Sequence, residues 1–306
     1  MKQLSVCAVV VTYNRKILLA RCLQALSNQS RKLDAIFIID NASTDGTFEY
    51  LRQNDLLSNS VVQFESLVSN QGGAGGFSYG LEKAFNSGFD YVWLMDDDGF
   101  PSETCLSDLL EFSDDNTYLG PLVLDIKNPE FLCFPMRIPN SLDVITNLDD
   151  LNVLIEKETI EGIVIPFNGI LLSAQLIKKI GFPKKEYFIW GDDIEYTLRA
   201  KSMGARIATI NSAKFYHPKE KSLGTSMFFG LLKFNDTPSE LKLYCMCRNS
   251  VVNHRVYNGY LHLFAFMFKP IWFYLFTKPN FKRLALSIRA MWHGLKKNFS
   301  YHRTLL

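Results

Sequence analysis

Short apolar runs alternate with segments of helical periodicity along residues 4–100. The runs at 6–14 (VCAVVVTYN) and 35–41 (AIFIIDN) are rich in β-branched residues and end in polar ones, which is typical of buried strands. Between them, apolar residues recur at the spacing of one helix face: Leu18, Leu19, Cys22, Leu23 and Leu26. A strand, a helix and a strand in this order form a βαβ unit, so the pattern predicts a parallel sheet.

Two further apolar runs extend this pattern. The run at 61–68 leads into Asn70 and a glycine cluster, and after a helix-like stretch at 79–86 the run at 91–98 (YVWLMDDD) ends in three aspartates. Ligands of open α/β sheets bind beyond the carboxyl ends of the strands, where these polar clusters fall. The predicted fold class is therefore α/β, with a ligand site along one edge of the sheet.

The three adjacent aspartates carry the most chemistry. Neighbouring carboxylates repel one another, and a divalent cation held by oxygen ligands and shared with a phosphate offsets that repulsion. On a continuing strand, alternation places Asp96 and Asp98 on one side and turns Asp97 away, so we expect the first two to bind the metal. A solvated acidic turn closed by Gly99 and Pro101 is the alternative, which the apolar run before it disfavours.

A second acidic cluster lies in the segment 188–200 (FIWGDDIEYTLRA). Asp192, Asp193 and Glu195 precede apolar residues at helical spacing, so we expect them at a helix N-terminus, where a carboxylate can act as general base toward a hydroxyl. Ordinary N-capping would explain one of these acids, but not three beside Trp190.

The glycine-rich segment at 70–80 (NQGGAGGFSYG) is a weaker signal. Glycine lets backbone N–H groups approach a phosphate or a ribose closely, yet the segment does not match the GxxxxGKS/T loop of ATPases. A flexible turn explains it equally well.

Taken in order, the motifs TYNR, DNASTDGT, NQGGAGGF, MDDDG and WGDDIEY, followed by Tyr216 and His217, resemble the family 2 glycosyltransferases of GT-A fold. Within them they look most like the galactofuranosyltransferase branch, over residues 4–220. The resemblance implies an inverting enzyme that moves galactofuranose from UDP-galactofuranose to a hydroxyl of a glycan, lipid-linked and belonging to polysaccharide or O-antigen biosynthesis. A rhamnosyltransferase using dTDP-rhamnose is the alternative within the family, and a non-catalytic sugar-nucleotide-binding scaffold is the alternative outside enzymes.

The resemblance also implies roles for individual residues. Asp193 matches the catalytic base with Asp192 and Glu195 as supporting acids, while Trp190 matches an aromatic that packs on the acceptor sugar, or else a core tryptophan. The residues that match the Mn²⁺ or Mg²⁺ site are Asp96, Asp98 and His217, the last of which is otherwise a solvated loop histidine. The residues that match the nucleotide-sugar site are Thr12, Asn14, Arg15, Asp40, Asn41, Asn70, Gly72, Gly73, Gly76 and Asp97.

The end of the sequence differs in charge from the rest. Eleven Lys and Arg residues follow Glu240 and no Asp or Glu does, so an acidic body precedes a basic region. The apolar stretch 257–277 is interrupted by Lys269 and Pro270 and does not reach the roughly twenty residues of a spanning helix. The next segment, 281–299, alternates apolar and basic residues at helical spacing, as a membrane-surface helix does.

We therefore expect a GT-A domain at 1–225 and a helical region at 226–306 that binds an anionic membrane surface. The alternative is a helical subdomain packed on the catalytic core or on a second copy in a homo-oligomer. Six scattered cysteines without a CxxC pair and no targeting segment favour a cytoplasmic protein, peripheral on the inner face of the cell membrane. No nucleic-acid-binding motif accompanies the basic region, so we expect no nucleic-acid partner.

Overall fold

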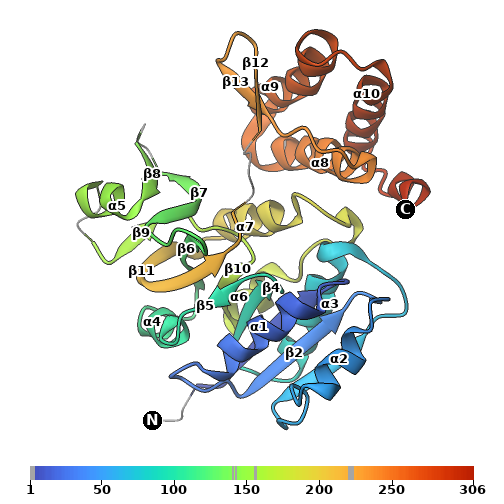
Figure 1. Cartoon of the computed structure of the whole chain (residues 1–306). Helices are drawn as coiled ribbons and strands as arrows, with labels where there is room; N and C mark the ends of the chain where they lie inside the picture. The colour runs from blue at the N-terminus through green and yellow to red at the C-terminus, as the bar shows by residue number, and fades with distance from the viewer. Residues whose placement is uncertain (1–3, 140, 142, 155–156, 220–223) are drawn as a thin grey trace. The chain divides into compact units, whose positions relative to one another are not determined.

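The computed structural model describes residues 4–139, 141, 143–154, 157–219 and 224–306 (Figure 1). The chain forms two compact units that interleave along the sequence. Unit 1 contains Met1–Gln71, Gly76–Phe182 and Ala200–Lys219, and unit 2 contains Gly72–Gly75, Pro183–Arg199 and Glu220–Leu306. The domain border expected at residue 225 stays a prediction, since the two units are not separated by one cut in the sequence.

Unit 1 is built on a mixed sheet that contains eleven strands within the described residues, with β3, β2, β1 and β4 adjacent and parallel. These four strands are Val62–Ser66, Ala35–Asp40, Val6–Thr12 and Tyr91–Asp96. The sheet continues through β10 (Asn168–Ser173), β6 (Thr117–Asp125), β11 (Arg206–His217) and β5 (Phe100–Pro101). The remaining strands are β7 (Phe131–Arg137), β8 (Val144–Asn147) and β9 (Thr159–Glu161). The predicted βαβ unit and parallel sheet are confirmed for the first four strands.

The helices that belong wholly or mostly to unit 1 are α1 (Lys16–Ser27), α2 (Thr47–Gln53), α3 (Gly72–Asn86), α4 (Cys105–Glu111), α5 (Leu148–Leu154) and α6 (Ala174–Ile180). The face of α1 predicted from its apolar spacing is buried at Leu19, Cys22, Leu23 and Leu26. Strands β1, β2 and β4 are buried along almost their whole length, because helices cover both faces of a parallel sheet.

Helix α3 begins seven residues earlier than its periodicity suggested, at Gly72 and not near Tyr79. Three of its glycines, Gly72, Gly76 and Gly80, lie close to other backbone and side-chain atoms: a Cβ on Gly80 would lie 2.5 Å from the side chain of Val9. The glycine cluster is therefore the first part of a helix, and not the loop that its composition suggested.

Unit 2 contains the start of α7 (Asp192–Ser202), a hairpin of β12 (Thr225–Met227) and β13 (Leu232–Phe234), and three longer helices: α8 (Glu240–Asn253), α9 (Gly259–Trp272) and α10 (Phe281–Leu295). Short π-helical segments follow α8 and α9, at His254–Asn258 and Phe273–Thr277. Helices α8 and α10 pack closely, since a Cβ on Gly294 would lie 2.5 Å from the carbonyl oxygen of Arg248. The helix predicted over 281–299 is confirmed in its larger part.

Among the helices of the described residues, none is both long enough and apolar enough to span a bilayer.

Candidate active site

The carboxyl ends of three adjacent strands bring polar residues to one edge of the unit 1 sheet. In the strand register Thr12 lies opposite Asp40, and Val11 lies opposite Asp96. The prediction that these polar clusters share one edge is confirmed. The side chains that follow β1, β2 and β4 can therefore act on one ligand.

The acidic triplet does not continue the strand. Strand β4 ends at Asp96, and Asp97 and Asp98 form a turn, so the expectation that alternation would turn Asp97 away was wrong. Asp97 is buried and accepts hydrogen bonds from the Thr12 hydroxyl (2.7 Å) and from Nη1 of Arg15 (3.2 Å). It fixes the acidic turn to the end of β1.

Asp98 and His217 meet across the site. Oδ1 of Asp98 lies 3.2 Å from Nε2 of His217, and its Oδ2 accepts a 2.7 Å bond from Nη1 of Arg15. Nδ1 of His217 lies 2.9 Å from the carbonyl oxygen of Pro218, to which it donates. With Nδ1 fixed by a backbone acceptor, Nε2 is the nitrogen presented to the acidic turn, as in histidines that bind a metal through one ring nitrogen and donate the other N–H to a carbonyl group.

The ionisable groups of this turn differ in how their pKa values are shifted. Burial, followed by the negative charges of Asp98 and Asp97, raises the pKa of Asp96 to about 8. Burial also raises the pKa of Asp97 to about 6, although bonds from Thr12 and Arg15 oppose it. Burial acts against the ionised form of Asp98, but His217 and Arg15 outweigh it and lower the pKa of that carboxyl. Conversely, burial disfavours the His217 cation, and Asp98 overcomes this to raise the pKa of His217 to about 10.

The residues at this edge fit a divalent cation only in part. Across the described ranges, no three His, Cys, Asp or Glu side chains are grouped as a complete metal site. Asp98 and His217 nevertheless offer an oxygen and a nitrogen ligand side by side, and the pKa of the neighbouring Asp96 is raised by burial and by the charges of Asp98 and Asp97. Such a partial set suits Mg²⁺ or Mn²⁺, because these ions take their other ligands from water and substrate phosphates.

Asn14 ties the end of β1 to the loop after β2. Its backbone is left-handed (φ 55°), its N–H donates to the Ser43 hydroxyl (2.8 Å), and its Oδ1 accepts from the N–H of Thr44 (2.7 Å). A short polar side chain adopts this conformation more readily than an apolar one.

Asn41 and Gly76 are fitted to each other. The N–H of Asn41 donates to the carbonyl of Thr12, and its Oδ1 accepts from the N–H of Gln71, before which lies the half-buried Asn70. A Cβ on Gly76 would lie 2.5 Å from Val11 and 2.9 Å from Nδ2 of Asn41. The contacts of Gly76 are thus packing contacts with β1 and with Asn41.

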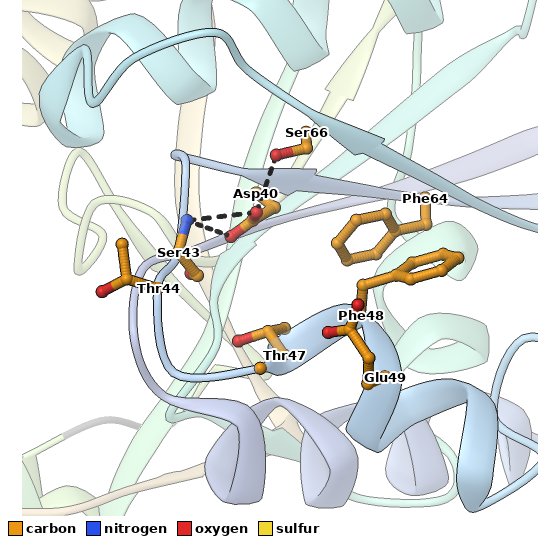
Figure 2. A pocket seen from close by; sticks show the side chains of 9 residues that line it. Asp40, Ser43, Thr44, Thr47, Phe48, Glu49, Phe64 and Ser66 are labelled. Carbon is orange, nitrogen blue, oxygen red and sulfur yellow. Dashed lines mark hydrogen bonds between the residues drawn. The ribbon is translucent and has the colours of Figure 1, made fainter.

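A cavity of about 540 Å³ opens beside Asp40 (Figure 2). Asp40 is buried, and its carboxylate accepts from the N–H of Ser43 and from the hydroxyl of Ser66. On the other side the rings of Phe48 and Phe64 lie 5.2 Å apart. No sequence motif indicated these lining residues, because they come from different elements: Phe64 and Ser66 belong to β3, and Phe48 belongs to α2.

The second acidic cluster belongs to unit 2 and confirms the predicted helix N-terminus. Trp190 and Gly191 have left-handed backbones (φ 62° and 88°) just before α7, which begins at Asp192. Asp192 is buried, whereas Asp193 is half-buried and accepts a bond from the N–H of Ile194 (2.7 Å). Burial raises the pKa of Asp193, and bonds from backbone N–H groups limit that rise. Trp190 is half-buried, with Nζ of Lys242 5.9 Å from its ring centre.

Glu195 is fully buried and heavily bonded. Its oxygens lie 2.8 Å from Nζ of Lys184 and 2.6 Å from Nη2 of Arg199, and the Tyr257 hydroxyl donates to it at 2.6 Å. Burial disfavours its charge, but these partners outweigh it and lower the pKa of Glu195. These contacts favour a structural role for Glu195, and its predicted part in orienting the acceptor stays a prediction.

Two glycines predicted to bind nucleotide also lie in unit 2. A Cβ on Gly72, which has φ 71°, would lie 2.0 Å from the carbonyl oxygen of Phe188, whereas a Cβ on Gly73 would meet no atom within 4 Å. Gly72 therefore permits the close approach of α3 to the segment 188–191, and only Gly73 has open space beside it.

Side chains of helix α8 bind backbone carbonyl groups of the segment 188–191, a role that no sequence motif indicated. Nδ2 of Asn249 lies 2.6 Å from the carbonyl oxygen of Trp190 and 3.1 Å from that of Ile189, and Nδ2 of Asn253 donates to the carbonyl of Gly191 (2.8 Å). The buried guanidinium of Arg248 donates to Oδ1 of Asn249 (2.9 Å), which turns the amide nitrogen toward the segment. Asparagine and arginine inside a helix interior give no periodic signal, so their function becomes visible only in three dimensions.

Comparison with known proteins places these features in a family. The model of Glycosyl transferase family 2 matches residues 7–155. Galactofuranosyltransferase GlfT1 of Mycolicibacterium smegmatis is 34% identical over 221 residues, which cover 70% of each chain. The enzyme of the same name from Mycobacterium tuberculosis is 34% identical over 219 residues, again 70% of each chain.

Solved structures share the fold at low sequence identity. S. aureus TarS superimposes with a TM-score of 0.60 at 15% identity over 99% of this chain and 50% of that chain. A shorter form of TarS in complex with UDP-GlcNAc gives 0.59 at 16% identity, covering 99% and 90%. GalNAc-T7 with UDP, GalNAc and Mn²⁺ gives 0.58 at 14% identity, covering 82% and 48%. The chain spans about half the length of the TarS chain first named and of GalNAc-T7, and the GT-A fold expected from the motifs is confirmed.

Proposed function

Because this chain belongs to glycosyl transferase family 2 and is a glycosyltransferase, we propose that it moves galactofuranose from UDP-galactofuranose to a hydroxyl of a glycan acceptor. The similarity to the GlfT1 enzymes supports this donor. The observation that carries the chemistry is the meeting of Asp98 and His217 at the strand ends where a nucleotide-sugar binds.

The nucleotide part of the donor is assigned to the edge of the unit 1 sheet. Asp40, with its cavity, accepts hydrogen bonds from the base or ribose, and Arg15 offers positive charge near the diphosphate. The full set proposed for the nucleotide-sugar is Thr12, Asn14, Arg15, Asp40, Asn41, Asn70, Gly72, Gly73, Gly76 and Asp97. In this set Thr12, Asn14, Asn41 and Asp97 act by shaping the backbone around the ligand.

Asp96, Asp98 and His217 are the residues that would hold Mn²⁺ or Mg²⁺. When bound, the cation supplies positive charge beside the departing diphosphate. The chain's own part is to present Nε2 of His217 and the carboxylates from fixed positions, with Pro218 orienting the imidazole. The Mn²⁺ in the GalNAc-T7 structure, which shares the fold, supports this assignment.

Asp193 is proposed as the general base toward the acceptor hydroxyl. Its raised pKa favours proton acceptance, and attack from the face opposite the leaving diphosphate gives a single displacement with inversion. Asp192 and Glu195 support it by fixing the start of α7, and Trp190 packs on the acceptor sugar.

We further propose that the acceptor is lipid-linked and that the enzyme works on the cytoplasmic side, peripheral on the inner face of the cell membrane. The excess of basic residues after Glu240 supports attraction to anionic lipid headgroups. Self-association through the same region is the alternative.

The donor assignment is tested by offering the purified chain UDP-galactofuranose, UDP-galactopyranose or dTDP-rhamnose with a glycan acceptor and Mn²⁺. Mass spectrometry should detect a product extended by one hexose from UDP-galactofuranose alone. Preference for dTDP-rhamnose would make the chain a rhamnosyltransferase. Tight UDP binding without turnover of any donor would instead support a non-catalytic scaffold.

A further inference from the structure

The β12–β13 hairpin meets the end of α9 in unit 2 (Figure 1). Five aromatic rings gather there. Phe228 of the hairpin lies 5.5 Å from Phe268 and 4.7 Å from Trp272, measured between ring centres. Phe229 lies 6.2 Å and Phe276 4.6 Å from the same tryptophan. We call Phe228, Phe229, Phe268, Trp272 and Phe276 the aromatic platform.

Three residues of the platform, Phe229, Phe268 and Phe276, are exposed to solvent. Phe229 is 90% exposed and Phe276 is 64% exposed, and both border a groove of about 460 Å³ beside Trp272. Further exposed apolar side chains lie on the same helix and hairpin, at Leu231, Leu261 and Phe264. Contiguous exposed apolar surface of this kind marks an interaction site.

The backbone of the hairpin turn is strained at two of these aromatic residues. Phe228 and Phe229 both have left-handed backbones (φ 48° and 55°), followed by Gly230 (φ 85°). Two successive bulky residues in this region cost free energy that a glycine or asparagine would not. A strained turn that holds an almost fully exposed phenylalanine indicates a functional constraint rather than a packing one.

The charge around the platform selects the partner. Neither the hairpin at 224–235 nor the stretch 257–278 contains an acidic residue, while Lys233 is exposed beside the turn and Lys269 lies on α9. The nearby Asp236 is bonded to Lys278 and Arg283. Two copies of this surface would bring like charges together, whereas anionic headgroups would complement them, and aromatic rings favour the boundary between headgroups and acyl chains.

We propose that the aromatic platform inserts into the headgroup layer of an anionic phospholipid membrane, with the tip of the β12–β13 hairpin as the leading element. This inference rests on the proposed membrane-linked acceptor and adds to it the surface that makes the contact. In this proposal the hairpin and α9, and not the amphipathic α10, make the main apolar contact with the membrane.

The test uses the full chain, a Phe229→Ser/Phe276→Ser variant and a Phe131→Ser variant. The first two positions are exposed, so their substitution leaves the core of unit 2 intact, and Phe131 is an exposed phenylalanine of unit 1 that serves as the matched control. Each protein is titrated with phosphatidylcholine vesicles that contain phosphatidylglycerol. Binding is followed by sedimentation and by quenching of tryptophan fluorescence with brominated acyl chains.

The intact chain and the control should bind the vesicles alike. The double variant should bind them at least about tenfold more weakly, and its tryptophan fluorescence should no longer be quenched. Transfer to a water-soluble acceptor should be equal in all three. Vesicle binding by a chain that transfers no galactofuranose would contradict the proposed function and still support the platform. Equal binding by the double variant would overturn the platform, as would loss of its transfer activity together with binding. Failure of the intact chain to bind vesicles, with a dimer that the double variant converts to monomer, would instead assign the surface to a second copy.

Discussion

The two acidic clusters of this glycosyltransferase are held in different ways. The turn of Asp96–Asp98 is fixed by Thr12, Arg15 and His217, all of which belong to motifs at strand ends. The start of α7 is fixed by side chains of α8 that bind the carbonyl groups of the segment 188–191. The first cluster is thus held through its charged side chains by residues of the motifs themselves. The second is held through the backbone of the preceding segment by a helix distant in sequence.

The largest effect is expected from removal of the proposed base. Asp193→Asn keeps the shape of the side chain but cannot take up the proton, so transfer should fall about a hundredfold or more while UDP still binds. Calorimetric UDP titration and product formation measured on one sample separate the two properties. Near-normal transfer would assign the base elsewhere, with Asp192 the first candidate to test.

The metal site should respond next. His217→Ala removes the nitrogen ligand, and we expect Mn²⁺ affinity to fall about tenfold to a hundredfold, measured by electron paramagnetic resonance of free Mn²⁺. Full transfer activity in excess chelator would contradict a metal role altogether. His262→Ala, at an exposed histidine of α9, is the matched control and should leave Mn²⁺ binding unchanged.

The contacts between α8 and the segment 188–191 can be removed without substituting a residue of either acidic cluster. Asn249→Leu removes the donors to Ile189 and Trp190, so we expect kcat to fall about tenfold and the free energy of unfolding to fall by about 1–3 kcal/mol, with UDP affinity retained. Asn235→Ala, at an exposed asparagine of the same unit, should change neither quantity. Equal loss of UDP affinity and kcat would show that the effect is general unfolding, and not positioning of the segment 188–191.

The last prediction concerns pH. Without metal, the pKa of His217 is raised to about 10 and that of Asp96 to about 8, so both groups carry protons near neutrality and must release them to bind a cation. Mn²⁺ affinity should therefore rise with pH below these values, by up to about tenfold per pH unit for each proton released. Calorimetry in buffers of different ionisation enthalpy measures that release, and a pH-independent affinity would exclude it.

Sequence reasoning predicted the parts of the molecule in which a local pattern has a local cause. The strands β1, β2 and β4, the helix face of α1 and the acidic start of α7 follow from periodicity and from charge at a helix end. It was wrong about Asp97, because it extended strand alternation past Asp96 into a turn. It was also wrong about the start of α3, because glycine disfavours helices in isolation and tertiary packing reversed that preference.

The rest depended on long-range contacts. Residues of β2, β3 and α2 line the cavity beside Asp40, and the contacts between α8 and the segment 188–191 join residues about sixty positions apart along the chain. For Phe48 and Asn249, no motif spacing in the sequence predicts a function. Pairing between such positions is decided by the fold and not by the pattern around each residue.

The glycine-rich segment also has a consequence for how the sequence can drift. Gly72 is confined by the carbonyl of Phe188, and Gly76 and Gly80 by side chains of the sheet strands, while Gly73 faces open space. In a saturation library selected for retained fold, Gly73 should accept many residues and the other three almost none. Gly72, Gly76 and Gly80 would then record steric fit between a helix and its neighbours, whereas Gly73 would be free to report on the ligand.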